Sequence, residues 1–174
     1  MWSLVGLTMA KAANKNYLSL FNAHPTIKIA VYRVSVFQEN SSNASGNMAR
    51  GYRTFRFEAV HSGGIVAVPR RLNSALPALD AAITCRKDGV VTPSSELEPL
   101  GCGMLAEQGD KNAGSSCNDL FDFRCFMLPM VVNSDFRWDL RPIVLNPNQG
   151  LVVRQDGFAG TGLLSTSMFF SVVR

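Results

Sequence analysis

The stretch from residue 163 to 173 alternates with a period of two, and this pattern constrains the fold more than any other feature of the chain. One set of positions is mainly apolar and comprises Leu164, Thr166, Met168, Phe170 and Val172. The positions between them are mostly serine, with Phe169 as the exception. Successive side chains of a β-strand point to opposite sides, so the pattern predicts a strand with one buried face. A chain that ends in this way is closing a sheet.

Turn residues divide the rest of the chain into short apolar runs that are typical of β-strands. We expect these strands at 17–21, 26–38, 51–61, 65–68, 82–86, 90–92, 121–132, 137–145 and 150–155. The strands at 26–38 and 51–61 are predicted to form an antiparallel pair. Those at 82–86 and 90–92 flank Lys87-Asp-Gly, which is a hairpin signal.

Two of these strands have patterns that predict more than their existence. In 26–38 the inward face starts with Ile27, Ile29 and Val31 and then shifts to Tyr32, Val34 and Val36. A shift of this kind predicts a β-bulge or burial on both faces. In 51–61 we expect one face to carry Phe55, Phe57 and Ala59, and the other Thr54, Arg56 and Glu58.

Three segments depart from the strand pattern. Residues 72–82 allow a short helical turn, which Pro77 limits. Residues 94–119 are rich in glycine and polar residues and predict a long irregular loop insertion. Residues 1–15 form an apolar N-terminal strand or a possible arm. The predicted fold is all-β: a single domain over 1–174, an antiparallel β-sandwich that is jelly-roll-like, with a distorted barrel as the alternative.

Composition narrows the possible partners. Of the 174 residues 17% are charged, and the net charge is +4. The basic residues are scattered, whereas a nucleic-acid interface needs them clustered with aromatics, so no nucleic-acid partner is expected. No apolar run reaches the roughly 18 residues of a membrane helix, and the apolar start lacks the basic residues of a signal peptide. We therefore expect no membrane partner.

Catalytic motifs are not evident. The two histidines, His24 and His61, are far apart and lack the clustering of a cupin metal site, so we expect surface or hydrogen-bonding roles for both. No Gly-x-Ser-x-Gly or phosphate-binding loop is present. The glycines at 157–162 predict a hairpin between two strands. The sequence thus predicts no enzyme, no catalytic residue, no cofactor and no metal.

The carboxylates Asp119, Asp122, Asp135 and Asp139 are the best remaining candidates for acid–base work or calcium. Asp135 and Asp139 flank Phe136 and Trp138, an arrangement that can mark a sugar-binding surface. The favoured interpretation is a loop that caps the core with the two aromatics.

The four cysteines are Cys85, Cys102, Cys117 and Cys125. Their spacing is irregular and is not that of a zinc site. Reduced thiols are favoured over a Cys102–Cys117 disulfide.

Several segments resemble those of small virion proteins of tailed bacteriophages. Asn16-Tyr-Leu-Ser-Leu-Phe-Asn followed by Ile27-Lys-Ile-Ala-Val-Tyr-Arg-Val is similar to the opening of these proteins, and Leu72-Asn-Ser-Ala-Leu-Pro-Ala-Leu to their central segment. The ending from Ile143 to Gln155, followed by the final strand, is the most similar. This chain has Pro147-Asn-Gln-Gly where the family has a Pro-Gly-Glu-Gly-type turn. The resemblance covers most of the chain except 94–119.

This resemblance implies a virion structural protein located in the particle, with no site residues to carry over. The expected role is a head decoration or cement protein that binds the major capsid protein and itself, as a dimer or trimer. The N-terminal arm, the 94–119 loop and the serine face of the last strand are the expected docking elements. The alternative is a tail or fibre component that binds a receptor or a glycan.

Overall fold

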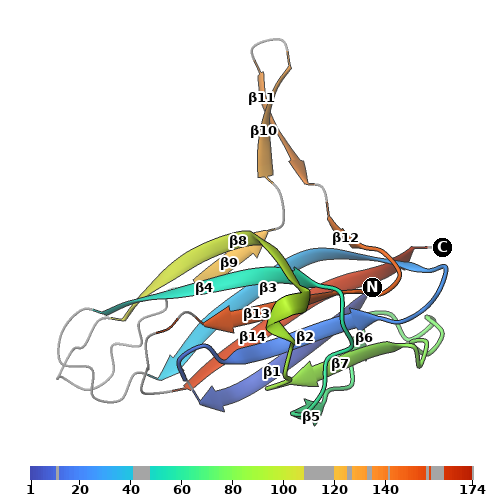
Figure 1. The fold of residues 1–174 in the computed structure, drawn as a ribbon. Helices are drawn as coiled ribbons and strands as arrows, with labels where there is room; N and C mark the ends of the chain where they lie inside the picture. The colour runs from blue at the N-terminus through green and yellow to red at the C-terminus, as the bar shows by residue number, and fades with distance from the viewer. Residues whose placement is uncertain are drawn as a thin grey trace.

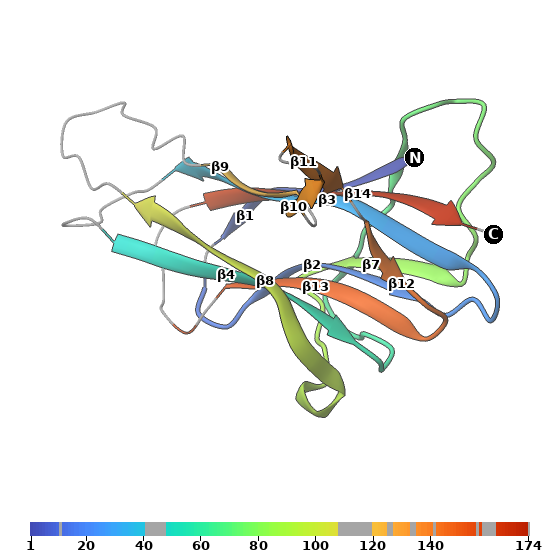
Figure 2. The same ribbon diagram turned by 90° about the horizontal axis from the view of Figure 1, so that it is seen from above.

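The structure is a computed structural model. It describes residues 1–10, 12–40, 48–107, 120–124, 127–132, 135–140, 142–155, 157 and 163–173. Within these residues the chain is all-β with antiparallel pairing, as the sequence predicts, and its strands form two six-stranded sheets that lie in two layers (Figures 1 and 2).

The first sheet has the order β12-β3-β14-β1-β6, and β9 also pairs with β3. Its strands are β1 (Trp2–Ala10), β3 (Lys28–Asn40), β6 (Arg70–Arg71), β9 (Leu120–Arg124), β12 (Ile143–Leu145) and β14 (Leu163–Val173). The long strand β3 pairs with β14 on one side, and with β9 and then β12 on the other.

The second sheet has the order β5-β7-β2-β13-β4-β8. Its strands are β2 (Asn16–Asn22), β4 (Met48–Phe57), β5 (Ile65–Val66), β7 (Ile83–Lys87), β8 (Glu96–Glu107) and β13 (Gln149–Gln155). Consecutive strands such as β1 and β2, β3 and β4, or β13 and β14 lie in opposite sheets. This order is consistent with a jelly roll.

Two further elements lie outside the two sheets. The strands β10 (Met127–Val132) and β11 (Asp135–Leu140) form a separate two-stranded hairpin, which extends away from the sandwich in Figure 1. The element η1 (Pro93–Ser95) is a short 3-10 helix just before β8.

The alternation of the last strand is confirmed. Leu164, Thr166, Met168 and Phe170 of β14 are buried, and the residues between them are half-buried. Because β14 lies between β1 and β3, its apolar face contributes to the centre of the core between the two sheets. Burying a large apolar side chain of this kind stabilises the fold by about 1.5–3 kcal/mol.

A second, smaller apolar cluster lies on the face of the second sheet that turns away from the first. It contains Phe21, Phe57, Val91 and Val152, with Phe55 packed against it. The sequence pairs Phe55 and Phe57 on one face of β4 correctly, but this face does not contribute to the main core. The main core instead receives Tyr52 from β4, and Thr54 is fully buried.

The bulge predicted within 26–38 is confirmed. The register of β14 against β3 jumps between Phe169, opposite Arg33, and Phe170, opposite Val31. Tyr32 is therefore the extra residue, and it is exposed rather than inward. Its hydroxyl accepts a hydrogen bond of 3.1 Å from Ser171 Oγ.

Two predicted strand pairs are wrong because long-range pairing overrides local turn signals. The strands at 26–38 and 51–61 become β3 and β4, which lie in different sheets. The turn at Lys87-Asp-Gly does not close a hairpin either. Strand β7 pairs with β2 and β5, and Val90 instead bridges to Ser62.

Two further expectations need correction, and the choice between two alternatives is decided for a third. No helical turn forms at 72–82, where Asn73 Oδ1 and Asp80 Oδ1 accept backbone hydrogen bonds within tight turns. Much of the expected 94–119 loop is strand β8, in which Gly101 and Gly103 interrupt the apolar pattern that predicts a strand. Residues 108–119 lie outside the described chain. Of the two alternatives for the apolar start, the strand is confirmed, because β1 pairs with β14 with one register shift between Gly6 and Met9.

We predict that Gly150→Ala destabilises the protein by about 1–3 kcal/mol, the usual cost of overpacking. A Cβ on Gly150 would lie 2.2 Å from Cζ of the buried Phe57 ring. Urea denaturation measures the loss. Gly157→Ala is the matched control, because its nearest contact is an ordinary 3.7 Å to Asn14 Oδ1, and a change within about 0.5 kcal/mol is expected there. Equal effects of the two substitutions would contradict this packing.

Candidate functional site

His61 is a buried titratable group with two side-chain partners. Its Nδ1 lies 2.7 Å from Ser19 Oγ, and its Nε2 lies 2.9 Å from Thr84 Oγ1. The ring packs between Phe21 and Phe57, each with a centroid distance of 5.9 Å. The imidazole thus joins β2, β7 and the segment after β4 over the second apolar cluster.

This serine–histidine contact lacks the geometry of an accessible nucleophile. Ser19 is fully buried, and the second nitrogen of His61 faces a threonine hydroxyl where a catalytic triad has a carboxylate. Burial, with a smaller contribution from the charge of Arg86, lowers the pKa of His61 to about 4. The ring is therefore neutral at neutral pH and serves as a hydrogen-bonding core residue, one of the two roles that the sequence indicates.

His24, the other histidine, lies in the turn before β3. Its Nδ1 accepts hydrogen bonds of 3.2 Å from the backbone N–H groups of Thr26 and Ile27. Its Nε2 lies 3.8 Å from Asp80 Oδ2. The two histidines are thus used separately: His24 holds backbone N–H groups of the turn, whereas His61 bonds two side-chain hydroxyls.

Arg154 forms the most developed charged contact of the described residues. Its guanidinium pairs with both carboxylate oxygens of Glu96, with 2.8 Å from Nη1 to Oε2, and its Nε donates to Asn16 Oδ1 at 2.7 Å. It also lies 5.1 Å from the centroid of the Phe55 ring. The side chains of Arg154 and Glu96 are only 18% and 14% exposed, so this pair ties β13 to β2 and to the start of β8.

The carboxylates singled out in the sequence are dispersed in the structure. Asp122 lies in β9 opposite Ser35, whereas Asp135 and Asp139 lie in β11 opposite Val132 and Leu128. Asp119 lies outside the described residues. Among the residues that the structure describes, no group of three or more His, Cys, Asp or Glu side chains could hold a metal ion.

Phe136 and Trp138 also lie in β11, opposite Val131 and Pro129. The segment is a strand of the hairpin that extends away from the sandwich in Figure 1, whereas the sequence predicts a loop here. The aromatics and the carboxylates of this segment thus share one protruding element.

The cysteines are placed only in part. Cys85 is a buried free thiol whose pKa is raised to about 12 by burial. Cys102 lies in β8 opposite Arg53, and Cys117 and Cys125 fall outside the described residues. None of the described helical residues forms a helix long and apolar enough to cross a membrane.

A groove with both polar and apolar walls follows the outer edge of β1. It has a volume of about 290 Å³ and is lined by Ser3, Val5, Leu7, Ile65, Val66, Ala67, Val68, Arg70 and Lys87. Leu7 is 64% exposed and Val68 84% exposed, so large apolar side chains face solvent here. Strand β6 covers only Trp2 and Ser3 of β1, and within the described chain no strand pairs with the rest of that edge.

This open edge is the feature that the sequence analysis missed. The start of the chain is apolar, but no local pattern in the sequence indicates that β1 leaves one edge largely unpaired. Comparisons with known proteins add no assignment: no family model, no curated protein and no solved structure matches this chain.

We predict that His61 makes stability depend on pH. Because the pKa is about 4 in the folded state and about 6.5 in the unfolded state, the unfolded state binds more protons between these values. The contribution is complete above pH 6.5 and falls by roughly 3 kcal/mol as the pH drops to 4. Denaturant titrations across this range should show a smaller loss for His61→Gln than for the wild type. Parallel pH profiles for wild type and His61→Gln would refute the assignment.

We also predict that Arg154→Ala lowers the free energy of unfolding by roughly 3 kcal/mol, because it leaves the largely buried Glu96 carboxylate unpaired. The matched control is Asp88→Asn, which removes the more exposed Lys15–Asp88 pair (3.2 Å) while keeping a residue that tolerates the positive φ of that position. The control should cost less than about 1 kcal/mol. Similar losses measured by urea denaturation would rule out the special role of Arg154.

Proposed function

We propose that this chain is a non-enzymatic structural protein of a virus particle, specifically a head decoration protein that binds capsid subunits and associates with itself. The observation that carries the proposal is the strand order of the two sheets. That order is consistent with a jelly roll, an architecture used by capsid and lectin domains as well as by cupins. The resemblance of several segments to phage virion proteins selects the virion among these uses.

The open edge of β1 supports self-association. The strand has neither proline nor a charged residue, two of the devices that protect an edge from pairing with another chain; its register against β14 shifts between Gly6 and Met9. Its exposed Val5 and Leu7 lie beside the exposed Ile65 and Val68 of the same groove. The occupant that we propose is β1 of a second copy, because an antiparallel pair of identical edges gives a closed, two-fold symmetric contact.

A glycan- or receptor-binding tail or fibre component is the second candidate. The observation that favours it is the protruding β10–β11 hairpin, which carries Phe136 and Trp138 between Asp135 and Asp139. Two aromatic residues at alternate positions of a protruding strand suit recognition of a sugar. Binding on a glycan array that is lost in Trp138→Ala would favour this candidate.

We predict that the purified protein is a dimer and that Leu7→Lys makes it monomeric, because a charge on an open strand edge opposes pairing. Sedimentation equilibrium at matched concentrations measures this. Val60→Lys is the control, since Val60 is 67% exposed, close to the 64% of Leu7, and does not line the groove. This variant should remain dimeric, and a monomeric wild type would count against association through β1.

The virion assignment has its own test in the composition of purified particles. A decoration protein is expected in hundreds of copies and should bind purified heads, whereas a few copies per particle would indicate the tail or fibre candidate. A protein absent from particles would overturn both.

A further inference from the structure

The protruding hairpin of β10 and β11 is a sheet of two strands only. It extends away from the sandwich in Figure 1, and within the described residues no strand pairs with the outer side of β10 or of β11. An isolated two-stranded hairpin is marginally stable in water, whereas three or more strands with an apolar face are stable. The hairpin would therefore gain stability from a further strand at one of its edges.

The proline of β10 indicates which edge can accept that strand. Pro129 lies opposite Trp138 in the register of the hairpin. In an edge strand, proline turns its nitrogen toward solvent, which makes Pro129 and Trp138 a pair without mutual hydrogen bonds. The outer edge of β10 thus lacks a donor, whereas the backbone N–H and C=O of Trp138 point to the free edge of β11. A further strand is therefore expected beside β11.

The sequence of β11 is complementary to itself in charge. From 136 to 140 it reads Phe-Arg-Trp-Asp-Leu, with Trp138 at the centre. If two copies pair antiparallel about a two-fold axis at Trp138, Arg137 of each copy comes opposite Asp139 of the other. In the same register Phe136 comes opposite Leu140. Opposite charges across two strands stabilise a sheet and like charges destabilise it, so this register suits a second copy of the same strand.

The neighbouring register is unfavourable for the same reason. An axis at Arg137 would place the two arginines opposite each other, and Asp135 opposite Asp139. The alternation of charge along β11 thus favours the axis at Trp138 over the axis one residue away.

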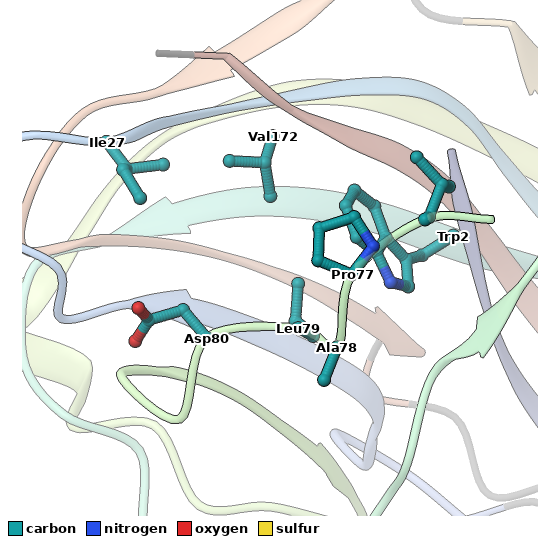
Figure 3. A pocket seen from close by; sticks show the side chains of 8 residues that line it. Trp2, Ile27, Pro77, Ala78, Leu79, Asp80 and Val172 are labelled. Carbon is teal, nitrogen blue, oxygen red and sulfur yellow. The ribbon is translucent and has the colours of Figure 1, made fainter.

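The apolar pocket at the start of β1 is less informative about a partner. It has a volume of about 530 Å³, and Trp2, Ile27, Leu79 and Val172 contribute to its lining (Figure 3). The indole Nε1 of Trp2 is buried without a hydrogen-bond partner and has almost no accessible surface, so it is not open to a ligand. Asp80 Oδ1 already accepts a hydrogen bond of 2.8 Å from the backbone N–H of Ala82. The charges of β11, in contrast, define the chemistry of the strand that would pair with it.

We infer that the free edge of β11 pairs with β11 of a second copy, antiparallel about a two-fold axis at Trp138, and that the two hairpins form a four-stranded sheet. This contact is distinct from the proposed contact at β1 and does not depend on the virion role. Because the paired segment is short, we expect a dissociation constant on the order of 0.1–1 mM. At micromolar concentrations the chain with Leu7→Lys therefore stays monomeric, and the β11 contact forms where copies are crowded together.

The test uses the full chain with Leu7→Lys, which removes the proposed contact at β1, so that failure of the two contacts can be distinguished. Sedimentation equilibrium up to about 1 mM should show a step of self-association. Arg137→Asp or Asp139→Arg, added singly, places like charges opposite each other and should weaken this step roughly tenfold or more. Within one copy these positions lie opposite Met130 and Leu128, so neither substitution opposes a charge across the hairpin.

Mixing the two single variants provides the matched control. In a mixed pair, Asp at 137 and 139 of one copy comes opposite Arg at 139 and 137 of the other, so the mixture should associate as the parent chain does. The chain with both substitutions should also associate with itself, because the charges are then exchanged and remain complementary. The proposal is overturned if the parent does not associate up to about 1 mM. It is equally overturned if either single substitution leaves association unchanged, or if the mixture does not restore it.

Discussion

The burial of one face of β14 is the constraint on which the remaining structure depends. The strand is the centre of the first sheet, and its side chains Leu164, Met168 and Phe170 enter the main core. Both neighbours, β1 and β3, must present their own apolar faces in the same register, and the bulge at Tyr32 corrects the phase of β3 to achieve this. A shift by one residue would bring the half-buried serines into the core, so the pairing is strongly specified.

The second sheet buries apolar side chains on both of its faces. Phe21 and Phe57 form an outer cluster, and His61 closes it with a hydrogen bond at each ring nitrogen. The Arg154–Glu96 ion pair connects β13 to the start of β8. Within the described residues the edge of β1 beyond Ser3 stays uncovered, and self-association is proposed there because Val5 and Leu7 are exposed beside it.

The sequence predicts the class of fold well because alternation is a local signal. The last strand, the bulge in β3 and the two-sheet all-β class follow from patterns within a single strand. The errors concern pairing: Lys87-Asp-Gly is a hairpin signal, yet β7 finds its partners in β2 and β5. Strand β8 was concealed by Gly101 and Gly103, which carry no hydrophobic signal although their backbone pairs with β4. No pattern in the sequence indicates that Trp2, Leu79 and Val172 meet, since they are distant along the chain.

The sequence by itself determined that this protein is built of short β-strands and which face of the last strand is apolar. Those properties depend on neighbours two residues apart, so they are visible without a structure. Only the tertiary structure decided which strands share a sheet, which edge stays open, and that the indole of Trp2 is buried without a partner. These features arise from contacts between residues far apart in sequence, which are selected by the packing of the whole sandwich and not by any local preference.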